Sequence, residues 1–585
     1  MLTRRDRSPS WLPAGPTTLG PVLARALSVP MAWQLLSLAC LAAAVSIGLQ
    51  GYYFGVINNS YHIPIVEGWF NDPQFATDQY IQSLRYHTSY VWPFARVMTR
   101  WLSTYDTFVV LHVANRLAMF VGFALLLRQL GVRTLAGLSA GLMTLALTRY
   151  LLAASGPGEH DLFMPFLNHS SLTWPFLFAS WLFLLRGQLV AALAMQGPVF
   201  AINAFVAICG GPAVAAGALV FRPAGRQLRR VFAWRLIAGI GLALLIAAPT
   251  IAWILASYTD QPAAAPFSFI AFLKSYYLKH WYVTAASPRR LVSFVIVGSS
   301  GLLCLHLLGD RAKSLIPVWW GYLAVFAAGA LLPYVLDSRT LLVLHPMRVG
   351  AGCLVMLSVL VIVAQLSQVL EEPGRALRRY AGAVGLLGFA AGQAGLLLMA
   401  AAVVVTVLPV RRSLPFRRRI AGGGSAALAW LAAGLLGVGA WRARYEPPPY
   451  DGPLLTAARD AGQWVRAHTA PGSMMFVPSG AIDGEDDPVS LWARRPVWYD
   501  WKEGAAVMWT PSYYQEWASR RADAATLRTV DEVLAYGCSH GIAVVVETTD
   551  RLRDPVLRQR LQAAIAYSNT DYVVLRPARL CRAQS

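Results

Sequence analysis

Long apolar blocks are the feature that most restricts what this chain can fold into. Stretches such as residues 31–51 and 315–336 contain almost no ionisable side chains. An α-helix rises about 1.5 Å per residue, so about twenty apolar residues cross the hydrocarbon core of a bilayer. Of the 585 residues, 56% are apolar and only 14% are charged, whereas about a quarter of a soluble domain is charged. The sequence therefore predicts a multi-pass membrane protein.

The formal net charge of +21 is best explained by membrane topology. Arg residues gather in short clusters between the apolar blocks, for example at residues 4–7, 222–235 and 375–379. Cytoplasmic loops of membrane proteins carry such an excess of Lys and Arg. We therefore expect the N-terminus inside the cell, a lipid bilayer as the main partner, and no nucleic-acid partner.

The alternation of clusters and blocks predicts three parts. Residues 1–30 form a cytoplasmic basic tail, and residues 31–445 form an all-α membrane domain of about 13 helices with a long external loop at 52–106. Residues 446–585 have the composition of a soluble α/β domain, which we expect in the periplasm. Within it, four stretches are typical of short strands: residues 474–477, 496–499, 542–547 and 572–575.

Two stretches of the membrane domain are harder to interpret. Residues 188–221 are too long for one straight helix and contain Gly210-Gly211-Pro212, so we expect two short helices with Asn203 near their junction. Residues 381–410 form either one long helix or a hairpin that turns near Gly392-Gln393. The five Arg residues at 411–419 should lie inside, which favours the hairpin and an external C-terminus. A single crossing would leave the C-terminal domain in the cytoplasm.

The first external loop carries two carboxylates of interest. Asp72 and Asp78 stand six residues apart in a loop that is far longer than a connection requires. Long loops with structure of their own are usually functional. The alternative is that both carboxylates are solvated on an amphipathic helix at the membrane surface.

Two other groups of external residues are candidates for ligand binding. Glu159, His160 and Asp161 could hold a metal or orient a phosphate, although their spacing matches no known metal site and a structural role is an equal alternative. Several cations lie in the later external loops, although Lys and Arg are expected mainly in cytoplasmic loops. This suggests an anionic partner such as a lipid phosphate. The alternative is that these cations only contact lipid headgroups. These cationic residues are Lys279, Arg339, His345 and Arg348.

Cysteine placement agrees with an external C-terminal domain. Four of the six cysteines lie in predicted membrane helices, whereas Cys538 and Cys581 lie in the C-terminal domain. These two can form a disulfide in an oxidising periplasm.

The layout and the loop stretch NDPQFATD (residues 71–78) resemble the GT-C superfamily of integral membrane glycosyltransferases, in a divergent bacterial branch. The resemblance implies a polyprenyl-phosphate-linked sugar as donor and an envelope glycan or a lipid as acceptor at the external face of the inner membrane. It implies a loop carboxylate as catalytic base, with Asp78 the first candidate and Asp72 the second. The tight DxD or ExD pair of better-known members is absent, so a divalent cation, Mg²⁺ or Mn²⁺, is left open as cofactor.

Two other functions remain as alternatives. Transporters and flippases of lipid-linked substrates usually carry ionisable residues within their spans. Here the spans are nearly free of charge, which favours chemistry at the membrane surface. A non-catalytic scaffold of polysaccharide assembly is the other alternative. The sequence has no Walker loop, dinucleotide fingerprint or GxSxG elbow, so nothing in it indicates ATP- or NAD-driven chemistry.

Overall fold

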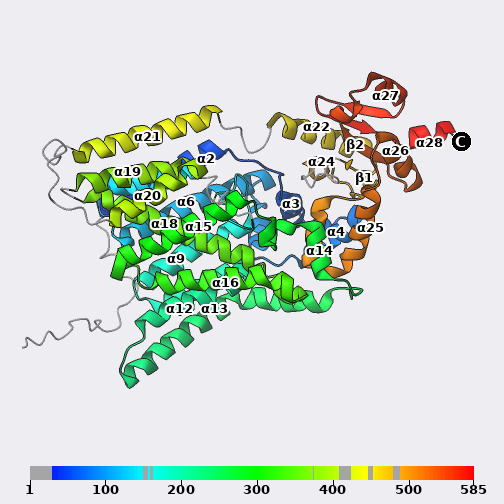
Figure 1. Ribbon diagram of the computed structural model, residues 1–585. Coiled ribbons are helices and arrows are strands. Elements are labelled where there is room, and N and C mark those ends of the chain that lie inside the picture. The colour runs from blue at the N-terminus through cyan, green and yellow to red at the C-terminus, as the bar shows by residue number, and fades with distance from the viewer. Residues whose placement is uncertain are drawn as a thin grey trace, which may run out of the picture.

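A bundle of apolar helices occupies one end of the molecule, and a small sheet with its own helices occupies the other (Figure 1). The computed structural model describes residues 29–148, 156–158, 163–372, 375–407, 423–445, 452–478 and 488–584. The predicted fold class, an all-α membrane domain followed by an α/β domain, is confirmed.

Eight of the described helices are long and apolar enough to cross a membrane. They are α2 (Val29–Gln50), α6 (Thr104–Leu130), α12 with η5 (Ala204–Phe221), α13 (Arg226–Asp260), α15 (Pro288–Leu308), α16 (Leu315–Val335), α18 (Pro346–Glu371) and α21 (Gly423–Tyr445). Shorter helices complete the bundle: α7 (Leu135–Leu147), α9 (Trp174–Leu185), α10 (Leu189–Ala194), α11 (Gln196–Ile202), α19 (Ala376–Ala390) and α20 (Leu396–Val407). The expected count of about 13 spans is therefore not established.

Helix α18 is the centre of the bundle. Its apolar segment is enclosed on all sides, and helices α6, α7, α12, α15, α16 and α19 pack around it. A helix that is apolar all round is stable only in such a buried position. Glycines allow the closest approach, because a Cβ at Gly350 would collide with the backbone of Phe326 on α16, and one at Gly329 with the backbone of Met347.

The two uncertain stretches have clear structures. Asn203 separates α11 from α12 and caps α12, with its Oδ1 accepting from the backbone N–H of Phe205 at 3.1 Å. The expected break at Gly210-Gly211-Pro212 was wrong, since α12 continues through Pro212. Tight packing explains this: a Cβ at Gly321 of α16 would lie 2.8 Å from the Cα of Ala213, so α16 supports α12 at this point.

The described residues of the stretch 381–410 form the hairpin that the Arg positions favoured. Helices α19 and α20 pack against each other and are joined by the turn η9 (Gly392–Gly395), where Gly392 has φ +79°. The helices have 15 and 12 residues, which is about 22 and 18 Å of helix and less than the hydrocarbon thickness. Both ends of the hairpin therefore face the same side of the bundle.

The long loop 52–106 is folded rather than extended. It forms the helices α3 (Asn59–Glu67), α4 (Gln79–Ser83) and α5 (Val91–Met98), with short turns η1 (Trp69–Asn71), η2 (Pro73–Phe75) and η3 (Leu84–Tyr86) between them. A second segment adds α14 (Phe269–Tyr276), η6 (Leu278–His280) and η7 (Val283–Ala285), and a third adds α17 (Arg339–Leu342). These segments make a layer over one end of the bundle.

The C-terminal part contains a four-stranded sheet of order β1-β2-β4-β3. Its strands are β1 (Met475–Phe476), β2 (Val544–Thr548), β3 (Ile565–Ser568) and β4 (Tyr572–Leu575). β1 pairs parallel to β2, and the other pairings are antiparallel, with Val545 opposite Leu575. Residues 496–499 do not form a full strand and contribute a single bridge to Met475. The helical elements are α22 (Gly452–His468), α24 (Pro488–Ala493), η11 (Trp501–Met508), η12 (Pro511–Tyr513), α25 (Tyr514–Ala524), α26 (Val530–Ser539), η13 (Thr549–Leu552), α27 (Pro555–Arg560) and α28 (Ala578–Gln584).

The loop layer and the C-terminal part share one hydrophobic core. Tyr80 and Trp92 of the first loop belong to the same cluster of buried side chains as Phe272 of α14 and Trp517 of α25. A smaller cluster lies between the sheet and α22. The C-terminal part is therefore packed onto the loop layer through an extensive apolar contact.

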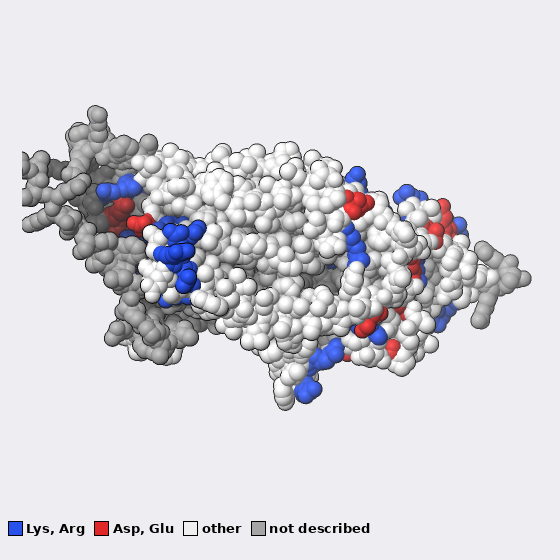
Figure 2. Space-filling model, turned by 90° about the horizontal axis from the view of Figure 1, so that it is seen from below, with Lys and Arg blue, Asp and Glu red and all other residues white. Residues whose placement is uncertain are grey.

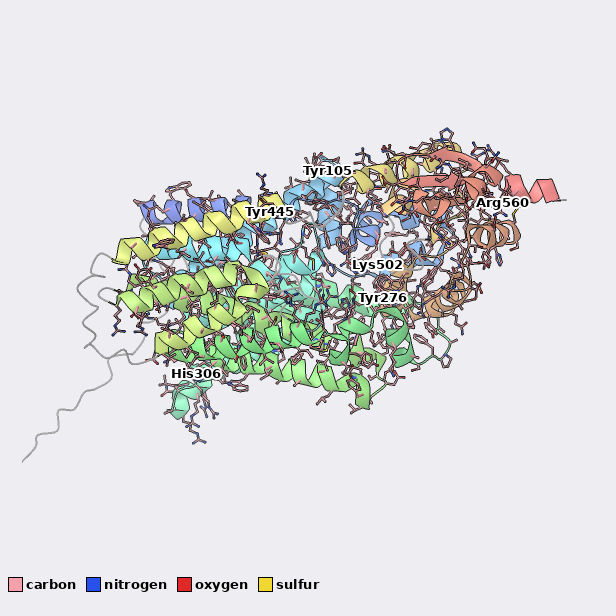
Figure 3. The ribbon with its side chains drawn as sticks, turned by 45° about the horizontal axis from the view of Figure 1, so that its top comes forward. Tyr105, Tyr276, His306, Tyr445, Lys502 and Arg560 are labelled. Atoms are coloured by element: carbon pink, nitrogen blue, oxygen red, sulfur yellow. A yellow bond between two sulfur atoms is a disulfide. The ribbon has the colours of Figure 1, made fainter. Side chains whose placement is uncertain are left out.

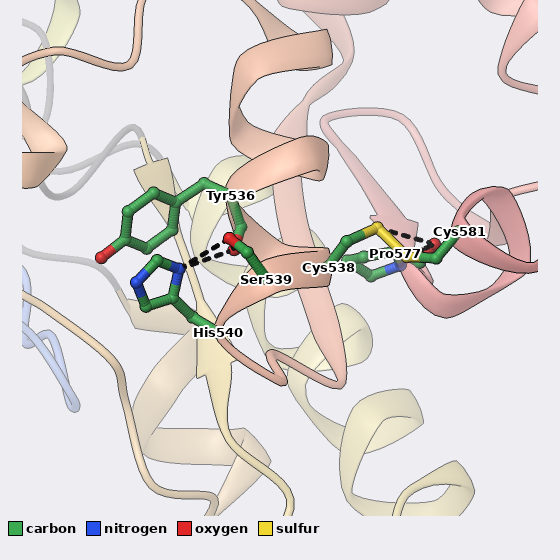
Figure 4. Close-up of a disulfide and its surroundings, with 6 residues drawn as sticks. All are labelled: Tyr536, Cys538, Ser539, His540, Pro577 and Cys581. Atoms are coloured by element: carbon green, nitrogen blue, oxygen red, sulfur yellow. Dashed lines mark hydrogen bonds between the residues drawn. A yellow bond between two sulfur atoms is a disulfide. The ribbon is translucent and has the colours of Figure 1, made fainter. Parts of the chain in front are cut away.

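A disulfide joins Cys538 of α26 to Cys581 of α28, with a Cα–Cα distance of 6.1 Å (Figure 4). This is the pair expected from the sequence. Beside it, the ring of His540 stacks on that of Tyr536 with 3.7 Å between ring centroids. The bridge holds the last helix of the chain to the helix that precedes β2.

Charged residues gather at the two ends of the molecule (Figure 2). A broad uncharged belt separates them among the residues described on this face. Helix α13 contributes exposed apolar side chains such as Trp234, Leu245 and Leu255. This distribution is the one that a bilayer requires of a protein that crosses it.

We predict that Gly350→Ala destabilises the protein by about 1–3 kcal/mol, the usual cost of overpacking a tight contact. The added methyl group would force α16 away from α18 at Phe326. Thermal unfolding in detergent measures the effect. Gly437→Ala on α21 is the matched control, since nothing lies within 4 Å of its added Cβ. Equal unfolding temperatures for the two variants would contradict the close α16–α18 crossing.

Candidate functional site

A cavity of about 380 Å³ lies between the helical bundle and the layer that covers its end. Its wall comes from segments far apart in the sequence: the first loop, η4 (His169–Thr173), α12, α13, α17, the start of α18, and η11 of the C-terminal part. In Figure 3, Lys502 lies beside Tyr276 at this boundary. The Tyr276 hydroxyl is 3.5 Å from the Lys502 carbonyl oxygen, and the Trp501 indole donates to the Tyr276 carbonyl at 3.0 Å.

The cavity is lined by cationic side chains. Arg339, His345 and Arg348 were expected from the sequence to bind ligand, and all three line the cavity. Lys502 joins them from η11, and His280 lies with its Nδ1 3.3 Å from the Arg348 guanidinium. The described residues of this lining include no carboxylate. The cavity is therefore suited to an anion.

Lys279 was expected at the same site, but it is not among the residues that line the cavity. Its neighbour His280 faces the cavity instead, because η6 is a tight turn in which successive side chains point in different directions.

His345 occupies a strained position at the start of α18. Its φ is +49°, a left-handed value that few non-glycine residues adopt. Its ring packs on Trp281 with 4.3 Å between ring centroids and lies 5.9 Å from Phe205. Such strain persists only where the surroundings hold it, and it is common at binding sites.

Three histidines cluster at one wall of the cavity, which His87 and His169 line, while His62 is buried behind them. His62 comes from α3, His87 follows η3, and His169 begins η4. Ring centroids of His87 and His169 are 5.3 Å apart, and those of His62 and His169 are 5.2 Å apart. His169 Nδ1 lies 3.2 Å from His62 Nε2, which is a hydrogen-bond distance. The Trp92 indole donates to His87 Nδ1 at 2.9 Å.

Burial keeps these imidazoles neutral. It lowers the pKa of His87 to about 4. Burial, followed by the charges of His87 and Arg348, holds the pKa of His169 well below its usual value. Burial, the two other histidines and Lys502 likewise lower the pKa of His62. The sequence did not indicate this cluster, because its members are separated by up to about a hundred residues and only the fold brings them together.

Apolar and uncharged polar side chains form the rest of the cavity wall. Trp174, Phe205, Val206, Ile254 and Val349 are among the apolar ones. Ile254 belongs to α13, whose outer face is exposed where a bilayer would lie. The cavity lining thus includes both cationic side chains and apolar side chains of the membrane helices.

Asp78 lines a separate, narrow pocket of about 30 Å³, which is room for about one water molecule. Its carboxylate caps α4 by accepting from the Ile81 backbone N–H at 2.9 Å. Asp500 and Glu503 share this pocket, and Lys502 lines both it and the large cavity. Burial raises the pKa of Asp78 to about 6. Burial, together with Asp78 and Asp500, raises the pKa of Glu503 well above its usual value, and Tyr513 donates to Glu503 at 2.8 Å.

Asp72 lies in an ion-pair group at the contact with the C-terminal part. Arg494 is 3.2 Å from Asp72 and 3.5 Å from Glu67, and its guanidinium covers the Trp69 ring at 5.0 Å. Asp72 lines neither pocket. The loop carboxylates therefore face the C-terminal part, whereas the cations face the cavity.

Glu159, His160 and Asp161 lie outside the described residues. Within the described part of the chain, no group of three His, Cys, Asp or Glu side chains has an arrangement that could hold a metal ion.

Comparisons with known proteins give the following likenesses. A family model described as a domain of unknown function (DUF6798) matches residues 456–524, which include η11 and Lys502. No curated protein matches the chain. The fold is similar to the crystal structure of ArnT from Cupriavidus metallidurans bound to undecaprenyl phosphate, at 13% identity and a TM-score of 0.46, over 94% of this chain and 98% of that one. The apo structure of the same ArnT gives 12% identity, a TM-score of 0.45 and the same coverage.

We predict that Asp78→Asn folds normally, whereas Asp78→Ala loses about 1 kcal/mol of stability, because Asn caps a helix as well as Asp does and Ala does not. The raised pKa of Asp78 adds a pH effect. Between about pH 4 and pH 6 the folded state holds a proton on Asp78 that the unfolded state has released. The free energy of unfolding of wild type therefore falls as pH rises through that window. Unfolding temperatures measured from pH 4 to pH 8 should show a weaker pH dependence for Asp78→Asn. If the unfolding temperature of Asp78→Asn depends on pH as strongly as that of wild type, the raised pKa of Asp78 is contradicted.

Proposed function

We propose that this protein is a membrane glycosyltransferase that transfers a sugar from a polyprenyl-phosphate donor to an envelope glycan or lipid acceptor. The observation that supports it most is the lining of the cavity, which includes the cations Arg339, Arg348 and Lys502 together with apolar side chains of the membrane helices. A polyprenyl phosphate likewise combines an anionic head with an apolar tail. Guanidinium and ammonium groups are the usual protein partners of phosphate.

The reaction needs few groups from the protein. The acceptor hydroxyl gives its proton to a base, its oxygen bonds to the anomeric carbon, and the bond from that carbon to the phosphate oxygen breaks. The phosphate leaves with the electron pair, and the configuration at the anomeric carbon is inverted. Cations beside the phosphate oxygens stabilise the charge that develops there. Arg348 and Lys502 are the cations that we assign to this role.

Asp78 is our first candidate for the base, and Asp72 is the second. Asp78 lies in the narrow pocket that has Lys502 in common with the cavity. Burial raises the pKa of its carboxyl to about 6, which brings it close to the working range of a general base. Asp72 is held in an ion pair with Arg494.

We also propose that the cavity and the C-terminal domain lie on the periplasmic side of the inner membrane. Among the described residues, Arg133 and Arg311 lie beside the far end of α18 from the cavity, where they donate to Glu371 and Gln368, and a cluster of Arg residues marks the cytoplasmic side. The hairpin of α19 and α20 returns to the side from which it starts, so α21 is left to carry the chain across. A periplasmic position also suits the disulfide between Cys538 and Cys581.

We predict that a periplasm-specific reporter fused after Arg442 is active and that one fused after Arg311 is inactive. A cytoplasm-specific reporter should give the reverse pattern at both sites. The Arg311 fusion is the control, because it follows α15 at the opposite end of the bundle. Cytoplasmic activity after Arg442 would exclude a periplasmic C-terminal domain.

We predict that Arg348→Gln and Lys502→Gln each weaken binding of undecaprenyl phosphate by about 10- to 100-fold, the usual effect of losing one charge-assisted hydrogen bond. Binding can be measured by calorimetry on the full chain in detergent. Arg289→Gln is the control, because Arg289 is exposed at the start of α15 and does not line the cavity. If the control weakens binding as much as the other two variants, the cavity is not the phosphate site.

We predict that Asp78→Asn lowers glycosyl transfer by about 10²- to 10⁴-fold, the usual cost of removing a general base, while undecaprenyl phosphate still binds. Asp72→Asn should reduce transfer much less. The readout is transfer of a radiolabelled sugar from polyprenyl phosphate to membrane glycans. Full activity of both variants would place the base elsewhere. If wild type binds undecaprenyl phosphate but transfers no sugar from any donor, the transporter or scaffold alternatives are favoured.

A further inference from the structure

The His62–His169 pair has an arrangement that the proposed transfer does not use. Nδ1 of His169 and Nε2 of His62 are 3.2 Å apart. A neutral imidazole has one nitrogen with a hydrogen and one without. The two nitrogens that face each other therefore share one hydrogen, and the orientation of the pair depends on its neighbours.

Asn203 fixes that orientation. Its Oδ1 accepts from the backbone N–H groups of Phe205 and Val206 at the start of α12. Its amide nitrogen must then point to η4, where it donates to Ser170 Oγ at 2.9 Å and lies 3.5 Å from His169 Nε2. An amide nitrogen only donates. His169 Nε2 is therefore the nitrogen without a hydrogen, and His169 Nδ1 donates to His62.

His87 has the opposite arrangement. The indole N–H of Trp92 can only donate, and it donates to His87 Nδ1 at 2.9 Å. The hydrogen of neutral His87 is therefore on Nε2, and its basic nitrogen is already occupied. The contact of the Asn203 amide with His169 Nε2 is longer, at 3.5 Å, and that amide also donates to Ser170 at 2.9 Å. Of the two rings that line the cavity on this wall, His169 therefore loses less when its basic nitrogen accepts a further proton.

The groups that face the pair are mainly cationic. Besides His87, the pair meets the fields of Arg348 from α18 and Lys502 from η11. His280 and His345 line the same cavity farther along, and the described lining contains no carboxylate. A proton added to the pair would face these positive charges in a poorly hydrated place, so the pair is neutral without a ligand.

We propose that the His62–His169 pair takes up one proton from solvent, at Nε2 of His169, when a phosphate anion binds in the cavity. The negative charge of the anion opposes the fields of Arg348 and Lys502 at the pair. It therefore weakens the electrostatic repulsion that a proton on the pair would meet, although the effect of burial is unchanged. The protonated ring adds a further positive charge beside the phosphate. This inference rests on the proposed function only in taking the phosphate from a lipid; inorganic phosphate shares the chemistry.

Calorimetric titration of the full chain in detergent tests the proposal. Undecaprenyl phosphate and inorganic phosphate are each titrated at pH 7.5 in two buffers of different ionisation enthalpy, and the difference in heat gives the protons taken up. We expect about one proton per bound phosphate. By linkage, we also expect affinity to weaken by up to about tenfold for each unit that pH rises within the titration range of the pair.

Substitutions locate the proton. His169→Asn and His62→Asn should reduce the uptake to near zero and still bind phosphate at pH 8. His306→Asn is the matched control, because His306 is exposed near the end of α15, away from the cavity (Figure 3), and it should keep the full uptake. All variants titrate the same ligand, so proton exchange by the phosphate itself cancels in the comparison.

Each result decides the matter. The proposal is overturned if wild type binds phosphate without taking up a proton. It is also overturned if both the His62 and the His169 variants keep the full proton uptake. Either result leaves the proposed function intact. Uptake with inorganic phosphate but no binding of undecaprenyl phosphate supports the proton site and contradicts the proposed function. No binding of either phosphate at any pH overturns both. If one of the two histidine variants does not fold, the other is compared with wild type and with His306→Asn.

Discussion

The enclosed helix α18 is the constraint on which the rest of the structure depends. Its apolar length is surrounded by six other helices, so it cannot shift without disturbing the whole bundle. Its first turn carries Arg348, three residues after the strained His345. Charged side chains are costly within hydrocarbon and collect where helices end. The position of α18 therefore fixes where a cationic site can form, namely beside the first turn of α18, at the side of the cavity that we call its floor.

A cationic floor alone would face open water, where phosphate binds weakly because charges are screened. The covering layer changes this. The first loop, α14 and the C-terminal part share one apolar core over the end of the bundle. This core brings Lys502 on η11 to the cavity that Arg348 also lines, and it brings His62 and His169 together at the cavity wall. Removal from water strengthens each of these electrostatic interactions.

The sequence predicts some of this arrangement well. Hydropathy located the long helices, and the Arg clusters correctly favoured the hairpin at Gly392, because both depend on composition alone. Arg339, His345 and Arg348 stood out because cations are unexpected outside, and they line the cavity. Lys502 and the histidine cluster could not be found this way, since contacts between distant segments are set by packing. The sequence also did not predict that Asp78 caps α4. This cap is a local hydrogen bond, but it lies in a segment that was interpreted as a loop.

The two pockets differ in their carboxylates. Asp78, Asp500 and Glu503 line the narrow pocket together with Arg495 and Lys502, whereas the described lining of the large cavity holds cations and imidazoles but no carboxylate. If those carboxylates lined the cavity, they would pair with Arg348 and Arg339 and compete with an anionic ligand. Lys502 stands between the pockets and lines both. Among the described residues, this arrangement keeps carboxylates away from the cavity wall, which suits that wall to an anionic ligand.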